Sequence, residues 1–199
     1  MKDKTITRKI SQGMYVLTTI GGGCVVDAVS QVSAGDNPLI SVAVMKSNYT
    51  NELMHNTDKF AISILGIDLD PKVIETFGMH SMRDYDKFAN FETIVIDDLH
   101  IIPNSLGYMI CEKVDMIEND THTIFIGRLI EADKFSDNDP MTYGYYQEHK
   151  NEIMKVQTEK GKTAWVCTIC GHIYYGENIP EDYICPVCGA KETAFTRML

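Results

Sequence analysis

Four of the six cysteines stand in two C-x-x-C pairs near the end of the chain, and this pattern restricts the fold more than any other feature. A C-x-x-C turn directs two thiolates to one point, and two such turns facing each other complete a tetrahedron. A glycine follows the second cysteine of each pair, and glycine permits a left-handed backbone there. The sequence therefore predicts one metal ion held by Cys167, Cys170, Cys185 and Cys188.

The spacing of these cysteines leaves the identity of the metal open. Four thiolates suit both zinc and iron, so a structural zinc ribbon remains an alternative to a redox centre. The segment after residue 161 is too small to fold by apolar burial alone, and we expect the metal to supply much of its folding free energy. Cys24 and Cys111 lie in strand-like runs, which indicates small buried hydrophobic side chains.

Length and charge restrict the remainder of the chain. With 199 residues, the chain can form one ordinary domain and a small appendage, and we place the boundary near Gly161, giving units 1–160 and 161–199. A formal net charge of −10 argues against nucleic acid as a partner. No apolar run long enough to span a membrane is present, and the charged start does not resemble a secretory signal. We expect a cytoplasmic protein.

Short strand-like runs rich in β-branched residues dominate the larger unit, with Asn119-Asp120 predicted as a hairpin turn between the last two. These runs are Met14–Ile20, Cys24–Val32, Leu39–Met45, Phe60–Leu65, Gly107–Glu118 and Thr123–Ala132. Two short helices are predicted, at 48–56 with Thr50 as N-cap and at 70–77 starting at Asp70-Pro71. Residues 147–162 read as a polar linker, in part helical. The fold class is therefore mainly β, an antiparallel barrel with a few short helices.

The C-terminal unit resembles the rubredoxins, in the short-loop form that is found as a tail on larger redox proteins. The resemblance covers about 163–199 and rests on the two cysteine motifs together with the aromatic residues Trp165, Tyr174 and Phe195. It implies that the metal is an iron that changes oxidation state by one electron.

The larger unit resembles the flavin reductase-like, FMN-binding split barrels over about residues 6–146. The motifs that carry this resemblance occur in family order, at 14–19, 26–33, 38–50, 77–83, 86–88 and 122–129. The resemblance implies a split β-barrel with bound FMN. In the family the second of these motifs lies along the flavin ring and ribityl chain, which implies contacts from Asp27, Ala28, Val29, Ser30 and Gln31. Asp27 stands where the family commonly has a neutral polar or small residue.

The third motif ends a strand and opens a short helix, where hydroxyls, backbone N–H groups and a cation can hold the FMN phosphate. The resemblance places Lys46, Ser47, Asn48 and Thr50 there. The alternative is that Lys46 is an exposed cation and that Ser47 and Thr50 are helix caps. Two more cations, Arg83 and Lys87, either add positive charge near the phosphate or are ordinary solvated charges.

Similar reductases place a histidine near the nicotinamide, and His122 occupies the corresponding position in this sequence. The alternative is that His122 is simply a polar residue at the start of a strand. A barrel with a rubredoxin tail implies an NAD(P)H-dependent oxidoreductase that passes electrons from FMN to iron and on to an acceptor protein, such as a flavodiiron reductase of oxygen or nitric oxide. The family also implies a homodimer. Two alternatives remain: an FMN-binding module with a structural zinc ribbon, and a relay that does not oxidise NAD(P)H itself.

Overall fold

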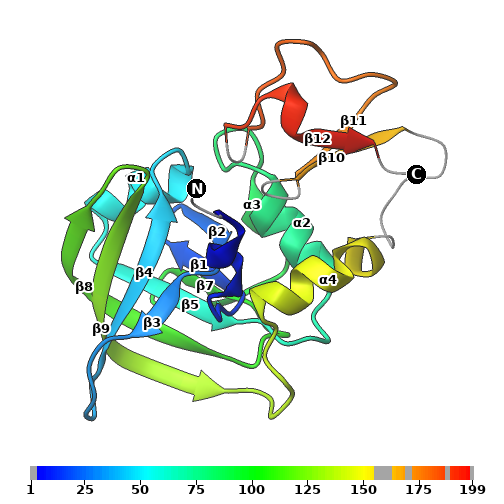
Figure 1. Cartoon of the computed structure of the whole chain (residues 1–199). Coiled ribbons are helices and arrows are strands. Elements are labelled where there is room, and N and C mark those ends of the chain that lie inside the picture. Colours follow the sequence, from blue (N-terminus) through cyan, green and yellow to red (C-terminus); the bar gives the residue numbers. More distant parts are fainter. Residues whose placement is uncertain (1–3, 155–162, 169–171, 187–188, 198–199) are drawn as a thin grey trace.

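A seven-stranded antiparallel sheet forms the larger unit of the computed structural model, which describes residues 4–154, 163–168, 172–186 and 189–197. The strands follow one another in the order β2-β1-β5-β8-β9-β4-β3. Their bounds are β1 Tyr15–Thr19, β2 Gly22–Val26, β3 Val29–Gln31, β4 Leu39–Met45, β5 Lys59–Ile64, β8 Gly107–Glu118 and β9 His122–Lys134. Figure 1 shows the sheet strongly curled, as a split barrel requires.

The two edge strands of this sheet, β2 and β3, are consecutive in the chain. Only Asp27 and Ala28 separate them, so the chain passes directly from one edge of the sheet to the other. β3 pairs with β4, and the N–H of Ala43 donates to the carbonyl of Ala28 at 3.0 Å. Among the described strands no ladder joins β2 to β3. The barrel therefore has a seam, and Asp27 lies on it.

Alternation along the strands places the core inside the curled sheet. In β4 every second residue is buried, which is the pattern of a strand with one face on a core. One apolar cluster fills the barrel and includes Leu17, Val42, Phe60 and Phe125. A second cluster lies under the helices that cover the barrel.

Four α-helices accompany the sheet in the described part of the chain: α1 Tyr49–Asn56, α2 Pro71–Met79, α3 Lys87–Asn90 and α4 Tyr143–Met154. The start of α2 is as predicted, because Asp70 accepts from the N–H of Lys72 and Pro71 follows it. The predicted cap of α1 is wrong: Asn48, not Thr50, is the N-cap and accepts from the N–H of Thr50 at 3.0 Å.

The smaller elements complete the chain. A 3₁₀ helix η1 (Lys4–Lys9) precedes the barrel, and a two-stranded sheet consists of β6 (Ile94–Ile96) and β7 (Leu99–Ile101). The C-terminal unit is a three-stranded sheet in the order β11-β10-β12. Its elements are β10 Ala164–Cys167, β11 Ile173–Tyr175, η3 Glu192–Ala194 and β12 Phe195–Arg197. This sheet lies on the side of the barrel that carries α2 and α3 (Figure 1).

One sequence prediction differs from the structure in this region. The strand expected at Cys24–Val32 is broken at Asp27 and Ala28, where the chain crosses the seam. The segment expected to be a linker in part helical does begin as a helix, because α4 continues to Met154. The boundary predicted near Gly161 falls outside the described residues.

Candidate functional site

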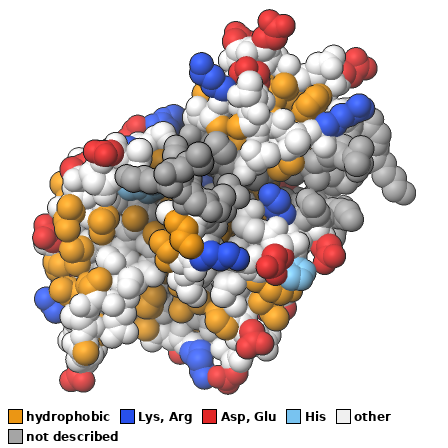
Figure 2. Space-filling view, in the orientation of Figure 1, with side chains coloured by type: hydrophobic (Ala, Val, Ile, Leu, Met, Phe, Trp, Pro, Cys, Tyr) orange, Lys and Arg blue, Asp and Glu red, His pale blue; other side chains and the backbone are white. Residues whose placement is uncertain are grey.

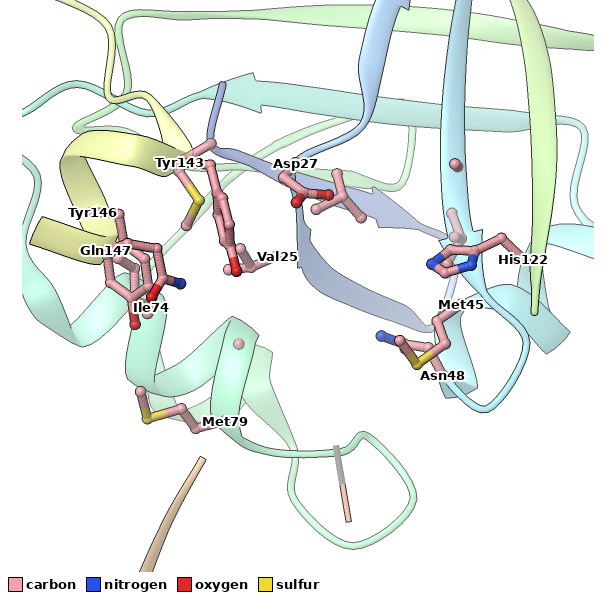
Figure 3. Close-up of a pocket in the computed structure, with 15 residues that line it drawn as sticks. Val25, Asp27, Met45, Asn48, Ile74, Met79, His122, Tyr143, Tyr146 and Gln147 are labelled. Atoms are coloured by element: carbon pink, nitrogen blue, oxygen red, sulfur yellow. The ribbon is translucent and has the colours of Figure 1, made fainter. Parts of the chain in front are cut away.

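A cavity of about 200 Å³ opens at the seam, between the barrel and the helices α2 and α4. It has a largely apolar wall with a few polar groups, the usual character of a small-molecule site. The barrel contributes residues of β2 and β4, and the helices contribute the opposite wall (Figure 3). Predicted site residues on its lining are Asp27, Asn48 and His122.

Asp27 and His122 are the titratable groups on the barrel side of this cavity. Asp27 lies on the seam and His122 begins β9, and Figure 3 shows both side chains at the cavity. Burial raises the pKa of the Asp27 carboxyl, while its own backbone N–H, the charge of His122 and the N–H of Ala28 act in the opposite direction. His122 is held at its strand end, because its Nδ1 is 2.8 Å from the Thr121 hydroxyl and its N–H donates to Asn119.

The start of α1 lies beside this cavity and carries the other predicted phosphate ligands. Asn48 lines the cavity, and Arg83 comes from the loop after α2, with Nη1 3.5 Å from the carbonyl oxygen of Ser47. The Arg83 guanidinium lies 5.0 Å from the centre of the Tyr49 ring and pairs with Glu52. Backbone N–H groups at a helix start and a planar guanidinium are what a phosphate group prefers.

Lys46 stands next to this helix start and is bound to a carboxylate. Its Nζ lies 2.6 Å from Glu118, which also accepts from Thr123 at 3.1 Å and lies 3.3 Å from His55 Nε2. Lys46 lowers the pKa of Glu118. A phosphate that recruits Lys46 competes with this ion pair.

Thr50 and Lys87 lie in the interior instead of at the cavity surface. Lys87 is 2% exposed, and its Nζ donates to the carbonyls of Gly23 at 2.8 Å and Phe77 at 2.9 Å. The sequence interpretation of Lys87 as a solvated charge is therefore wrong. Thr50 is 1% exposed and is a hydrogen-bond partner of the buried Cys24 thiol.

The remaining predicted flavin contacts follow the seam. Ala28 crosses it, and Val29, Ser30 and Gln31 form the edge strand β3. Val29 is half-buried, whereas Ser30 and Gln31 are exposed along the barrel edge. None of these four is on the cavity lining.

Sequence reasoning did not assign the opposite wall of the cavity. α2 supplies Ile74, Gly78 and Met79, and α4 supplies Tyr146 and Gln147. The apolar pattern of α2 gave the signal for a helix but not for what it faces. Two aromatic residues of α4, Tyr143 and Tyr146, also line the cavity.

The metal-binding unit shows half of the predicted centre, because Cys170 and Cys188 lie outside the described residues. Cys167 and Cys185 are 0% and 1% exposed and share one cluster with Phe195. Each begins the same backbone turn: the N–H of Cys167 donates to the carbonyl of His172 at 2.8 Å, and that of Cys185 to the carbonyl of Ala190 at 2.7 Å.

These two turns have the same length, since 172 − 167 and 190 − 185 are both five residues. Gly189 has φ +71°, the left-handed conformation expected after the second cysteine of a pair. Two matching turns that bury a thiol in one cluster fit a four-thiolate metal centre. Trp165, Tyr174 and Tyr183 pack around this cluster.

Comparisons with known proteins agree with this geometry. Residues 7–154 match the model of the flavin reductase like domain, and residues 165–196 match the rubrerythrin, rubredoxin-like domain. The chain is 30% identical to the high molecular weight rubredoxin of Moorella thermoacetica, over 98% of this chain and all of that protein. It is 26% identical to the ferric-chelate reductase (NAD(P)H) of Archaeoglobus fulgidus, over 81% and 93% of the two chains.

Solved structures repeat the fold of the barrel. The NADH:FAD oxidoreductase SgcE6 of Streptomyces globisporus superimposes with a TM-score of 0.65 at 21% identity, covering 71% of this chain and 87% of that one. The flavin reductase HpaC complexed with NADP⁺ gives a TM-score of 0.61 at 20% identity, covering 71% and 91%. In the part of the chain that the structure describes, every helix is too short or too polar to cross a bilayer.

The curled sheet, the cavity at its seam and the family match define an oxidoreductase with a split barrel, and the chain belongs to the flavin reductase-like family. With its rubredoxin-like second unit it has the two-part composition of the high molecular weight rubredoxins, a recognition that the sequence motifs had already indicated. The predicted fold class is confirmed.

Proposed function

We propose that this protein oxidises NADH or NADPH with FMN in the seam cavity and passes the electrons singly to an iron in its C-terminal unit. The observation that carries the proposal is one chain with two sites: a cavity lined by Asp27 and His122, and a pair of matching cysteine turns. Flavin, when bound, accepts a hydride and releases electrons one at a time, and a four-thiolate iron carries one electron. The cytoplasm keeps such thiols reduced.

The residues of the cavity have distinct roles in this proposal. The apolar side chains Val25, Ile74 and Met79 exclude water from the flat ring of the cofactor. His122, at the β4 side, orients the nicotinamide over it. Asp27 places a carboxyl group next to the ring, and the segment Ala28 to Gln31 follows the ribityl chain. These assignments rest on where each residue lies along the seam.

The phosphate of FMN binds at the start of α1. Ser47 and Asn48 would hold it, and Arg83 would leave Glu52 to pair with it. Lys46 approaches from the end of β4, away from Glu118. Thr50 and Lys87 support this corner from the interior, through the Cys24 thiol and the carbonyl of Gly23.

The electrons leave the iron for a soluble acceptor protein of the flavodiiron type. Glu177, Glu181 and Asp182 are exposed on the metal-binding unit, and Figure 2 shows acidic side chains at its outer end. Such a surface favours an acceptor with a basic docking patch, because complementary charge accelerates encounter. Association should weaken as salt is added.

The barrel is proposed to work as a homodimer. The outer part of the β8–β9 hairpin exposes apolar side chains, among them Val114, Met116 and Ile117, at 47%, 42% and 50%. An apolar surface of this kind is typical of an interface. Sedimentation equilibrium of the purified protein tests this assignment, and a monomer at micromolar concentration would contradict it.

One visible spectrum, recorded anaerobically before and after addition of NADH or NADPH, tests the proposed function. We expect flavin and iron–thiolate bands together, and both should bleach. A colourless tail with stoichiometric zinc, even from cells supplied with excess iron, would instead support the structural zinc ribbon. Flavin that bleaches only with a protein donor would support the relay.

Cys185→Ser separates the two cofactors. Cys185 is 1% exposed within the cysteine cluster of the C-terminal unit, far along the chain from the seam cavity. The variant should lose the iron bands and keep the flavin bands, and NAD(P)H should still bleach the flavin. Loss of both cofactors would contradict two separate sites.

A further inference from the structure

One side chain of the metal-binding unit contacts the wall of the seam cavity. His172 begins the described segment after Cys170, and its Nδ1 is 3.2 Å from the carbonyl oxygen of Met79. Met79 is the last residue of α2 and lines the cavity, as Figure 3 shows. In the part of the chain that the structure describes, this hydrogen bond joins the unit that holds the cysteines to the wall of the proposed flavin site.

The partners of His172 determine which of its nitrogens carries the proton. A carbonyl oxygen only accepts, so Nδ1–H is the donor to Met79. In the neutral ring, Nε2 then accepts from the hydroxyl of Tyr183, 3.0 Å away. Tyr183 belongs to the cysteine cluster. The ring of His172 also stacks on Tyr183 and meets Phe195 edge-on. Its orientation is therefore held by the metal-binding unit itself.

The backbone of His172 reaches the metal centre. Its carbonyl accepts from the N–H of Cys167 at 2.8 Å, as part of the first cysteine turn. One residue thus contacts a predicted metal ligand through its main chain and the cavity wall through its side chain. On the other side of the bond, Met79 offers a carbonyl from the last turn of α2, a group that no residue of its own helix satisfies.

We propose that His172 docks the metal-binding unit on the wall of the flavin cavity and that this contact sets the rate of electron exchange between the two centres. The inference rests on the proposed function. Each exchange takes one electron from the reduced flavin and converts one ferric ion to ferrous, and the flavin protons go to water. Without the contact, the unit samples many positions on its tether, and electron transfer weakens steeply with distance.

Three variants separate the hydrogen bond from the packing of the ring. His172→Phe keeps an aromatic ring against Tyr183 and Phe195 but removes the donor. His172→Asn loses the ring but keeps an N–H near the position of Nδ1. Arg197→Ala, at an exposed position of β12, is the matched control in the same unit.

Anaerobic stopped-flow mixing of the holoprotein with NADH measures both steps. The flavin band of His172→Phe should bleach at the wild-type rate, and the iron band at least tenfold more slowly. His172→Asn should recover most of the wild-type rate, and Arg197→Ala should match wild type. The proposal is overturned when His172→Phe reduces its iron as fast as wild type, or when His172→Asn is as slow as His172→Phe.

Hydrogen–deuterium exchange of the resting protein gives a readout that needs no turnover. In His172→Phe the amides at the end of α2, next to Met79, should exchange faster than in wild type and in Arg197→Ala. Unchanged protection overturns the docking contact. If neither NADH nor NADPH reduces the flavin, the proposed function fails, and this exchange measurement still decides the docking claim by itself.

Discussion

Lys87 is a buried cation in an otherwise apolar region behind the cavity. Burial lowers its pKa from the ordinary value to about 8, while the nearby Cys24 and Asp84 act in the opposite direction. Its ammonium group satisfies two main-chain carbonyls, of Gly23 in β2 and Phe77 in α2. One side chain therefore connects the edge of the sheet to the helix that forms the opposite wall.

Lys87→Met should destabilise the barrel, because two carbonyls lose their donor without access to water. We expect a loss of about 2 kcal/mol in the free energy of unfolding at pH 7. Urea unfolding followed by far-ultraviolet circular dichroism measures it. Lys113→Met is the control for a lysine nearer the surface. A change of less than about 0.5 kcal/mol in the unfolding free energy of Lys87→Met would contradict a connecting role for Lys87.

The same residue makes stability depend on pH. The folded pKa of about 8 lies below the ordinary 10.5, so between these values the unfolded chain binds the proton that the native chain has released. Stability from Lys87 therefore rises with pH across this window, by up to about 3 kcal/mol. The difference in unfolding free energy between wild type and Lys87→Met should grow from pH 7 to pH 10. A constant difference would count against the lowered pKa.

Arg83 allows a test of the phosphate site with a matched pair of ligands. Arg83→Gln should weaken FMN binding about tenfold, as expected for loss of one charge-assisted contact. Riboflavin, which lacks the phosphate, should bind both forms equally. Fluorescence quenching of each flavin measures the affinities, and Arg128→Gln, on the exposed side of β9, serves as control. Equal weakening for riboflavin would place Arg83 away from the phosphate.

At the scale of elements, the middle of β9 requires a residue without a side chain. A Cβ at Gly127 would lie 2.5 Å from the ring of Phe60 and 2.7 Å from the Cβ of Cys111, both in the core. β9 pairs with β4 and β8 at this point. Because β9 is paired on both sides, its backbone cannot move away from Phe60 and Cys111 without breaking ladder hydrogen bonds.

Gly127→Ala should therefore destabilise the barrel by about 2 kcal/mol through overpacking. Thermal unfolding of the flavin-bound protein measures the change. Gly144→Ala in α4 is the matched control, because its nearest neighbour would be 3.8 Å away, and alanine there should stabilise by about 0.5–1 kcal/mol. Equal thermal stability of the two variants would show that the core around Phe60 accommodates an added methyl group at little cost.

Element prediction from sequence succeeded where a local signal exists. Asp70-Pro71 predicts the start of α2, and alternation predicts β4. The prediction failed for the strand at Cys24–Val32, because β2 and β3 are both strand-like and only the closure of the barrel bends the chain at Asp27. The sequence predicted a partly helical segment after residue 146 but did not place Gln147 of α4 on the cavity wall.

At the scale of the whole molecule, the two units derive their stability from different sources. The barrel has two large apolar clusters, whereas the cluster of the metal-binding unit has three buried members among the described residues, Cys167, Cys185 and Phe195. A core of this size needs a metal to fold.

Removal of the metal should therefore unfold the C-terminal unit and leave the barrel intact. The fluorescence of Trp165, the single tryptophan, reports on the tail alone, and far-ultraviolet circular dichroism reports mainly on the sheet. We expect a strong chelator under reducing conditions to change the fluorescence of Trp165 and to preserve most of the circular dichroism signal. A tail that keeps its tryptophan spectrum without metal would contradict this division.

The cysteine motif predicts the metal-binding unit directly, because the chemistry of the ligands is local in sequence. The cavity could not be predicted in the same way, since its walls come from β2, β4, α2 and α4, which only the tertiary fold brings together. For the same reason no pattern in the sequence places His172 next to Met79, 93 residues away.

The seam also has a mechanical consequence. Every other neighbouring pair of described strands in the barrel is held by a ladder, so bending the sheet elsewhere breaks main-chain hydrogen bonds. At Asp27 the edge strands β2 and β3 are joined by the chain itself and by no ladder of hydrogen bonds among the described strands. We expect the barrel to deform most easily at this point. We therefore expect a flat aromatic molecule that binds at Asp27 to displace the two edge strands and leave the rest of the barrel unchanged.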